Sequence, residues 1–127
     1  MNAGFTLIEL IIVLLIVGII VGISIPQYTE SIKNALRKEA LMGLELIISA
    51  ERVRKLELGS FCSCSNTQDC NDRLRLDLGN ANWNFSVFSL GGGSWRANAQ
   101  YIGTRSDLNS CYRIFYENGN VGNATCN

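Results

Sequence analysis

The sequence contains no histidine and one proline among its 127 residues, and its formal net charge is zero. The missing histidine removes the commonest general base and metal ligand of proteins. Eleven basic residues balance eleven acidic ones, so no net charge attracts nucleic acid or an acidic substrate. A chain of this length has room for one modest domain. We therefore expect a structural or interaction protein, without a cofactor, a metal or a nucleic-acid partner.

A long apolar run lies near the N-terminus, from Phe5 to Ile25, and only Thr6, Glu9 and Ser24 are polar within its 21 residues. A helix of that length spans roughly 31 Å, which is the thickness of a hydrocarbon core. A cleaved secretory signal has a shorter apolar stretch, a basic region before it and a small-residue site after it. None of these features is found here. The run therefore predicts a retained membrane span.

Glu9 is the unusual residue of this span. A carboxylate at the bilayer centre costs about 2.5–3.5 kcal/mol on insertion scales. Because Glu9 lies one turn from the start of the run, its side chain can reach toward the interface. The alternative is a cationic partner, which another chain or a free amino terminus must supply because nothing else in the span is charged.

The residues after Pro26 predict an amphipathic continuation of this helix as far as about Leu58, where Gly59 is a plausible stop. Apolar and small residues recur there every three or four positions and define one buried face: Ile32, Leu36, Ala40, Gly43, Ile47 and Ala50. Charged residues occupy much of the remainder. Among them, Glu51 and Lys55 form a favourable i,i+4 pair on a solvated face.

The C-terminal part predicts a small antiparallel sheet, so the fold class is α+β. Its first strand alternates with period two, with Trp83, Phe85 and Val87 on one side. Three glycines then form a turn, and Asn118-Gly119 is a strong hairpin dipeptide. The expected strands and turn are Trp83–Leu90, the turn Gly91–Gly93, Trp95–Ile102, Cys111–Tyr116 and a short edge strand from Val121 to Cys126.

The N-terminal motif resembles that of a type IV prepilin. Gly4-Phe5-Thr6-Leu7-Ile8-Glu9 is followed by the apolar helix and then by Ile25-Pro26-Gln27-Tyr28. The resemblance implies that a prepilin peptidase cuts after Gly4 and methylates the amine of Phe5. It further implies that Glu9 pairs with the Phe5 amine of a neighbouring subunit during filament assembly. The leader Met1–Gly4 departs from the family pattern because it is short and lacks a basic residue.

The resemblance also implies a domain layout. Residues 1–4 are the leader, residues 5–27 are the membrane-spanning and filament-core half of the helix, and residues 28–127 are the globular head with the amphipathic half. Gly18, Gly22 and Pro26 weaken the helix between the two halves. We expect the helix to bend near Pro26 and to unwind locally there, as this stretch does in assembled pilins. A small-xxx-small contact between two helices at Gly18 and Gly22 is the alternative.

Five cysteines behind a membrane segment suggest disulfides in an oxidising compartment, and the odd number leaves one unpaired within the chain. Cys111 and Cys126 flank the last hairpin and resemble the disulfide-bounded loop of many pilins, so they are the first candidate pair. Cys62, Cys64 and Cys70 lie in a stretch predicted as a loop. Since Cys62 and Cys64 are too close to bridge each other comfortably, we expect Cys70 to bond one of them.

Two metal sites were weighed and are not favoured. The C-x-C-x5-C spacing supplies thiolates but lacks the second pair or the histidines of a zinc site. The oxygens of Asp69, Asn71 and Asp72 do not have the spacing of an EF-hand loop. We therefore expect neither zinc nor calcium.

The sequence thus predicts a non-enzymatic, filament-forming pilin subunit. We expect it to be held once across the inner membrane, cut by the peptidase, and assembled by the pilus machinery into a homo-oligomeric helical filament at the cell surface. A type II secretion pseudopilin shares the N-terminal motif and is the alternative. A membrane-tethered enzyme or receptor is a remote third hypothesis, because no catalytic constellation is recognisable.

Overall fold

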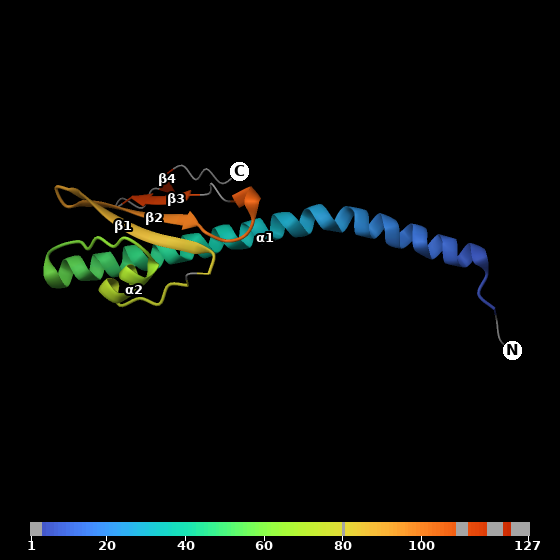
Figure 1. The fold of residues 1–127 in the computed structure, drawn as a ribbon, viewed down its shortest axis with the longest axis horizontal. Coiled ribbons are helices and arrows are strands. Elements are labelled where there is room, and N and C mark those ends of the chain that lie inside the picture. The colour runs from blue at the N-terminus through green and yellow to red at the C-terminus, as the bar shows by residue number, and fades with distance from the viewer. Residues whose placement is uncertain (1–3, 80, 109–111, 117–120, 123–127) are drawn as a thin grey trace. The chain divides into compact units, whose positions relative to one another are not determined.

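The computed structural model of the chain describes residues 4–79, 81–108, 112–116 and 121–122, the last two ranges by their backbone alone. Figure 1 shows the elements in chain order: α1 (Leu7–Leu58), α2 (Thr67–Leu74), β1 (Trp83–Gly91), β2 (Ser94–Tyr101), the 3-10 turn η1 (Ser106–Leu108), β3 (Tyr112–Tyr116) and β4 (Val121–Gly122). The α+β class is confirmed. The chain divides into two compact units, residues 1–35 and 36–127, and α1 is continuous from the first into the second.

The first unit contains the apolar start of α1, whose side chains from Leu7 to Ile25 are uncovered. Its large apolar residues from Leu7 to Ile25 are 49–77% exposed. The most apolar window has a mean hydropathy of 3.0 and none of it is buried. The helix is thus long and apolar enough to cross a membrane. Exposed to water, such a surface is unfavourable, so this unit requires lipid or other helices around it.

The helix of the single chain remains continuous through the stretch expected to unwind, because α1 includes Pro26. A proline removes one backbone donor, and the hydrogen bonds on either side of it can persist. Two hydroxyls bond to helix carbonyls nearby: Ser24 Oγ donates to the Ile20 carbonyl at 2.7 Å and Thr29 Oγ1 to the Pro26 carbonyl at 2.9 Å. The single chain therefore does not show the expected unwinding, and unwinding in an assembled filament stays a prediction. A bend at Pro26 stays a prediction.

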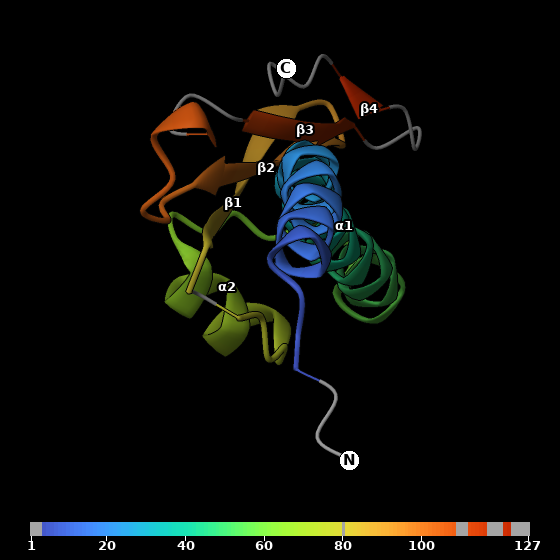
Figure 2. The ribbon, with the colours of Figure 1, turned by 90° about the vertical axis from the view of Figure 1, so that its right-hand side faces the viewer.

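The second unit contains the sheet, in which β1, β2, β3 and β4 follow one another as antiparallel neighbours (Figure 2). The first pair runs from Trp83 opposite Tyr101 to Gly91 opposite Ser94, with a shift of register between Ser89 and Gly91. All three glycines of the intervening turn have positive φ angles of 63–84°, a conformation that favours glycine. The first three predicted strands and the glycine turn are confirmed. The fourth strand is described over Val121–Gly122, and the rest of the predicted edge strand and the Asn118-Gly119 turn lie outside the described residues.

The core lies between the sheet and the C-terminal half of α1. The predicted period-two face is confirmed, since Trp83, Phe85 and Val87 are all buried. The Phe85 ring lies so close to Gly43 that a β-carbon there would overlap with it. A glycine at this helix position thus permits the close approach of strand and helix. The other large buried side chains are Leu44, Ile47, Trp95, Tyr101 and Leu108.

The helix α2 corrects the prediction of a loop around the first cysteines. Asn66 caps it by accepting a hydrogen bond from Asp69 N at 2.9 Å. Thr67, which is 3% exposed, attaches the helix to β1 because its hydroxyl accepts from Phe85 N at 3.0 Å. The helix therefore brings Cys70 into the core.

Glu51 corrects a second prediction, because it lies in the core and not on the solvated face. Its residue exposure is 0%, and its Oε2 accepts a hydrogen bond from Cys62 N at 2.9 Å. The other oxygen, Oε1, is buried without a partner in the described part of the chain. Burial raises the pKa of this carboxyl above its ordinary value, although the Cys62 N–H and the nearby Arg54 charge oppose the shift.

We predict that this carboxyl makes the head less stable as pH rises. A folded-state pKa above the unfolded value means that the stabilisation is present below the unfolded pKa, near 4.5, and is lost as pH rises through the folded value. Glu51→Gln keeps an acceptor for Cys62 N and cannot ionise, so the melting temperature of this variant should depend less on pH. Near-UV circular dichroism of the full chain in nonionic detergent measures the melting temperature of each protein at several pH values. Glu45→Gln, at an exposed position, is the control, and equal pH slopes in all three proteins would contradict the prediction.

Candidate functional site

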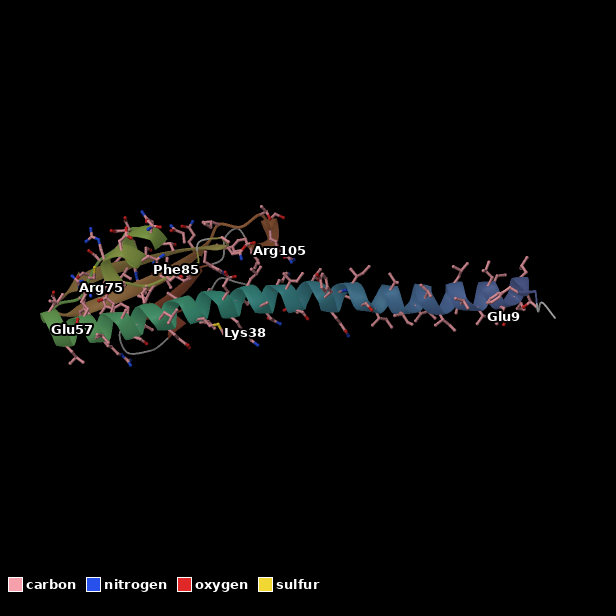
Figure 3. The ribbon with its side chains drawn as sticks, turned by 90° about the horizontal axis from the view of Figure 1, so that it is seen from below. Glu9, Lys38, Glu57, Arg75, Phe85 and Arg105 are labelled. Carbon is pink, nitrogen blue, oxygen red and sulfur yellow. A yellow bond between two sulfur atoms is a disulfide. The ribbon has the colours of Figure 1, made fainter. Side chains whose placement is uncertain are left out.

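The start of α1 is built by a reciprocal capping arrangement between Thr6 and Glu9. Glu9 N donates to Thr6 Oγ1 at 3.3 Å, while Glu9 Oε2 accepts from Thr6 N at 3.4 Å and from Thr6 Oγ1 at 3.2 Å. This is the capping box of a Thr-x-x-Glu sequence, which satisfies backbone donors that a helix start leaves free. Figure 3 shows Glu9 at this end of α1. Sequence reasoning missed the role of Thr6, although its spacing from Glu9 is the signature.

The capping arrangement determines where the helix begins. The sequence predicts a start at Phe5, whereas α1 begins at Leu7 because Thr6 serves as its cap. Gly4 and Phe5 therefore lie outside the helix, and both are exposed. Nothing lies within 4 Å of a β-carbon built on Gly4, and Phe5 is 77% exposed. The peptide bond between them is thus not locked into helical hydrogen bonding or covered by side chains.

The structure places the predicted assembly residues Phe5 and Glu9 within one turn of each other at this end. Within the described part of the chain the Glu9 carboxylate has hydrogen bonds from Thr6 and no ion-pair partner. A carboxylate has about four acceptor sites. The capping bonds use one of its oxygens, so the other is free to accept from an amine of a second chain. Gly18, Gly22 and Pro26 lie farther along the same helix and do not join this site.

The cysteine pattern is resolved in part. Cys64 and Cys70 form a disulfide, which confirms that Cys70 bonds one of its two neighbours. Cys62 is a free, buried thiol whose backbone N–H is held by Glu51. The pair predicted first, Cys111 with Cys126, lies outside the described residues. The antiparallel pairing of β3 with β4, which these two cysteines flank in the sequence, is present.

Apart from the free thiol of Cys62, the candidate metal ligands are engaged in other bonds. Cys64 and Cys70 are bonded to each other, so they are not thiolates. Asp69 accepts from Ser65 N at 2.9 Å and pairs with Arg73, and these contacts lower the pKa of its carboxyl. No cluster of three or more potential ligands occurs in the described part of the chain.

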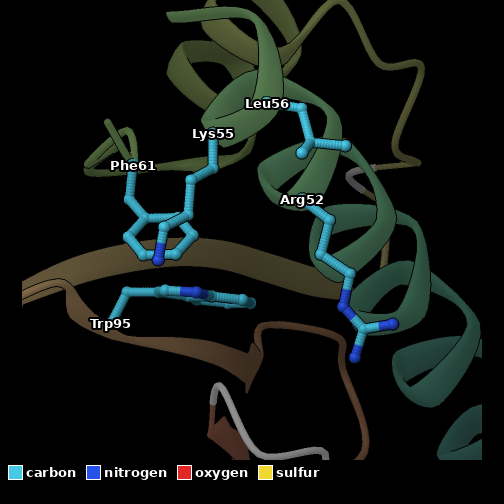
Figure 4. Close-up of a pocket in the computed structure, with 5 residues that line it drawn as sticks. All are labelled: Arg52, Lys55, Leu56, Phe61 and Trp95. Atoms are coloured by element: carbon cyan, nitrogen blue, oxygen red, sulfur yellow. The ribbon is translucent and has the colours of Figure 1, made fainter. Parts of the chain in front are cut away.

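A cleft of about 380 Å³ lies in the head beside the last turns of α1 (Figure 4). Trp95 and Phe61 form an aromatic wall, with their ring centroids 5.8 Å apart, and the Lys55 ammonium lies 4.2 Å from the centre of the Phe61 ring. Arg52 and Leu56 complete the lining. The lining contains no carboxylate, hydroxyl or thiol, so these side chains do not form a nucleophile with a general base.

The comparisons with known proteins agree with the geometry of the N-terminus. Residues 1–25 match the family model of the prokaryotic N-terminal methylation motif. No match was found among curated proteins or among solved structures. The motif covers the exposed Gly4–Phe5 bond, the capping box and the apolar start of α1. The N-terminus of this chain therefore carries the N-terminal methylation motif that is the signature of type IV prepilins.

Proposed function

We propose that the chain is a structural subunit of a type IV pilus, made as a membrane-anchored precursor and assembled into a helical filament through α1. The observation that carries this proposal is an apolar helix that begins with a processing motif and that no described residue of the chain covers. A membrane covers it before assembly, and the helices of sister subunits cover it afterwards. The head, which has its own core, stays outside the membrane.

Processing by the prepilin peptidase exposes the group that assembly needs. Cleavage after Gly4 creates an amine on Phe5, and methylation of this amine keeps its positive charge. In an apolar filament core, burying this amine or the Glu9 carboxylate alone costs free energy, because each charge loses its water. An ion pair between the two offsets that cost. Their pairing between neighbouring subunits offsets the loss of solvation and sets the axial position of one subunit on the next. Other helix contacts are apolar and less selective.

A type II secretion pseudopilin is the second candidate, because the N-terminal motif is common to both families. The antiparallel β3–β4 hairpin that Cys111 and Cys126 flank favours a pilin, in which a disulfide closes this region. Mass spectrometry of filaments sheared from the cell surface distinguishes the two. A pilin is recovered there as a chain beginning with N-methylated Phe5, whereas a pseudopilin is absent from long surface fibres under ordinary expression.

We predict that Thr6→Val weakens the first turn of α1, because valine keeps the shape of threonine and removes the hydroxyl that caps Glu9 N. Loss of a threonine cap costs about 1 kcal/mol. The amides of Glu9 and Leu10, which both donate to Thr6, should then exchange with solvent roughly fivefold faster in detergent micelles. Thr6→Ser retains the cap and should exchange as the parent does. Equal exchange in all three proteins would show that the cap contributes nothing.

Glu9→Gln separates capping from charge pairing. Glutamine retains an oxygen that can accept from Thr6, but it cannot form an ion pair with the Phe5 amine. Leaving one member of a buried pair alone costs about 3–5 kcal/mol, so incorporation into filaments should fall by more than about tenfold while membrane insertion continues. Quantitative immunoblots of sheared filaments and of membranes measure the two. Glu45→Gln, on the exposed surface of the same helix, is the control. Normal assembly of the Glu9 variant would remove the pairing role.

A further inference from the structure

The helix α1 carries a second apolar stripe besides the face that packs in the head. From Ile25 to Leu56, ten positions follow one another by alternate steps of three and four residues, and eight of them are apolar: Ile25, Tyr28, Ile32, Ala35, Met42, Leu46, Val53 and Leu56. This is the spacing of the a and d positions of a coiled coil. We call these residues, with Glu39 and Ser49 at the two polar positions, the heptad stripe.

Within the second unit, from residue 40 to residue 56, the heptad stripe lies on the opposite side of the helix from the head core. At about 100° per residue, the buried residues of α1 centre about 180° from the stripe in the segment from residue 40 to residue 56. Met42, Leu46, Val53 and Leu56 are accordingly 50–87% exposed, whereas Ala40, Leu44, Ile47, Ile48 and Glu51 are buried. Packing within the head therefore accounts for one apolar face of α1 and leaves the other at least half exposed. Leu46 and Val53 of that face also line an open groove with Leu74 and Leu76.

The spacing of the stripe indicates what kind of surface would cover it. Apolar a and d positions sustained over three or more heptads are typical of a helix that packs lengthwise on another helix. A second copy of the chain supplies such a helix with the same stripe. Because both copies have their N-termini in the same membrane under the proposed function, their helices run parallel. The orientation of the pair rests on that function.

One pair of opposite charges supports a parallel pair of copies, whereas the other charged g positions, Lys38 and Glu45, face Gly43 and Ala50. In this register Arg52 is a g position and Glu57 is the e position that faces it five residues later on the partner helix. Both belong to the last turns of α1, where Figure 3 labels Glu57. Neither residue forms an ion pair within its own chain among the residues that the structure describes. A parallel pair would join Arg52 of each copy to Glu57 of the other.

The two polar positions of the stripe do not block this contact. The Glu39 carboxylate accepts from Asn82 Nδ2 at 3.1 Å, so it has a partner in its own head and need not enter the seam. Ser49 Oγ donates to the Glu45 carbonyl at 2.9 Å, which satisfies its hydroxyl within the helix. A small side chain at this place lets two helices approach closely.

We propose that the heptad stripe is the interface of a parallel pair of copies in the membrane, formed before the chains enter a filament. The pair covers an apolar face that the head leaves exposed, and the crossed Arg52–Glu57 contacts fix its register. Membrane anchoring makes the association easier because it confines both copies to one layer and one orientation.

Site-specific photo-crosslinking of the full chain tests the interface. A benzophenone amino acid replaces Val53, and the protein is made in a host membrane without any other pilus protein. We expect a crosslinked dimer whose adduct maps to residues 46–60 of the second copy. The same probe at Leu90, which is 55% exposed in the β1–β2 hairpin, is the control and should give little dimer. Adducts at residues 5–25 alone, or no dimer, would overturn the proposal.

A charge exchange tests the register. With the probe at Leu46, Arg52→Glu places two like-charge pairs across the interface and should lower the dimer yield roughly five- to tenfold. The double variant Arg52→Glu with Glu57→Arg restores opposite charges and should recover the yield. Failure of the double variant to recover excludes the parallel register. Circular dichroism confirms that each variant is folded.

The outcome does not depend on filament formation, because these measurements use no assembly machinery. A dimer without filaments in the native host would support the stripe and contradict the pilus function. Filaments in the native host without a dimer in the test membrane would support the pilus function and contradict the heptad stripe as an interface. Loss of the dimer in Leu46→Gln with Val53→Gln, but not in Leu90→Gln with Ile102→Gln, would show that the apolar stripe drives association, since all four residues are at least half exposed.

Discussion

The structure depends on one constraint, which is that the apolar start of α1 cannot be covered by its own chain. The head buries its core with the sheet and with α1 from Ala40 to Glu51, and nothing of the described chain covers Leu7 to Ile25. Water is an unfavourable solvent for such a surface. Under the proposed function, the molecule exchanges one apolar environment for another, lipid for sister helices. The methylation motif covers the start of this apolar segment.

The capping box changes how the charge of Glu9 should be understood. A carboxylate in an apolar segment seems to demand a partner from another molecule. In the single chain, Thr6 supplies two donors to one oxygen of Glu9, and Glu9 in turn completes the first turn of the helix. The precursor can thus hold Glu9 before any sister chain arrives. In the proposed filament, pairing with an amine would add charge compensation to a side chain that the helix start already holds.

The predictions that rest on periodic patterns of apolar residues are confirmed for β1. The wrong predictions concern α2, which depends on a helix cap, and Glu51, which is a buried polar group. Alternation from Trp83 to Val87 identified β1 because each side chain reports its own face of the sheet. The helix α2 was missed because its short Thr67–Leu74 segment has few apolar residues, and its best signal was the Asn66 cap. Glu51 was placed on the surface because charge usually indicates exposure. Its burial depends on Cys62 N, which is 11 residues away and invisible to local pattern.

The heptad stripe is hard to recognise in the sequence for a related reason. One apolar face of α1 already accounts for packing in the head, and the charged residues elsewhere on the helix suggest that its other positions face solvent. Met42, Leu46 and Val53 break that assignment, because they are apolar, regularly spaced and exposed. A helix that buries Glu51 in its core while exposing Leu56 does not follow the simple division into apolar inside and polar outside. Such an inversion is understandable when the outer face has a partner of its own. The same constraint that governs the first unit therefore extends along α1 into the head.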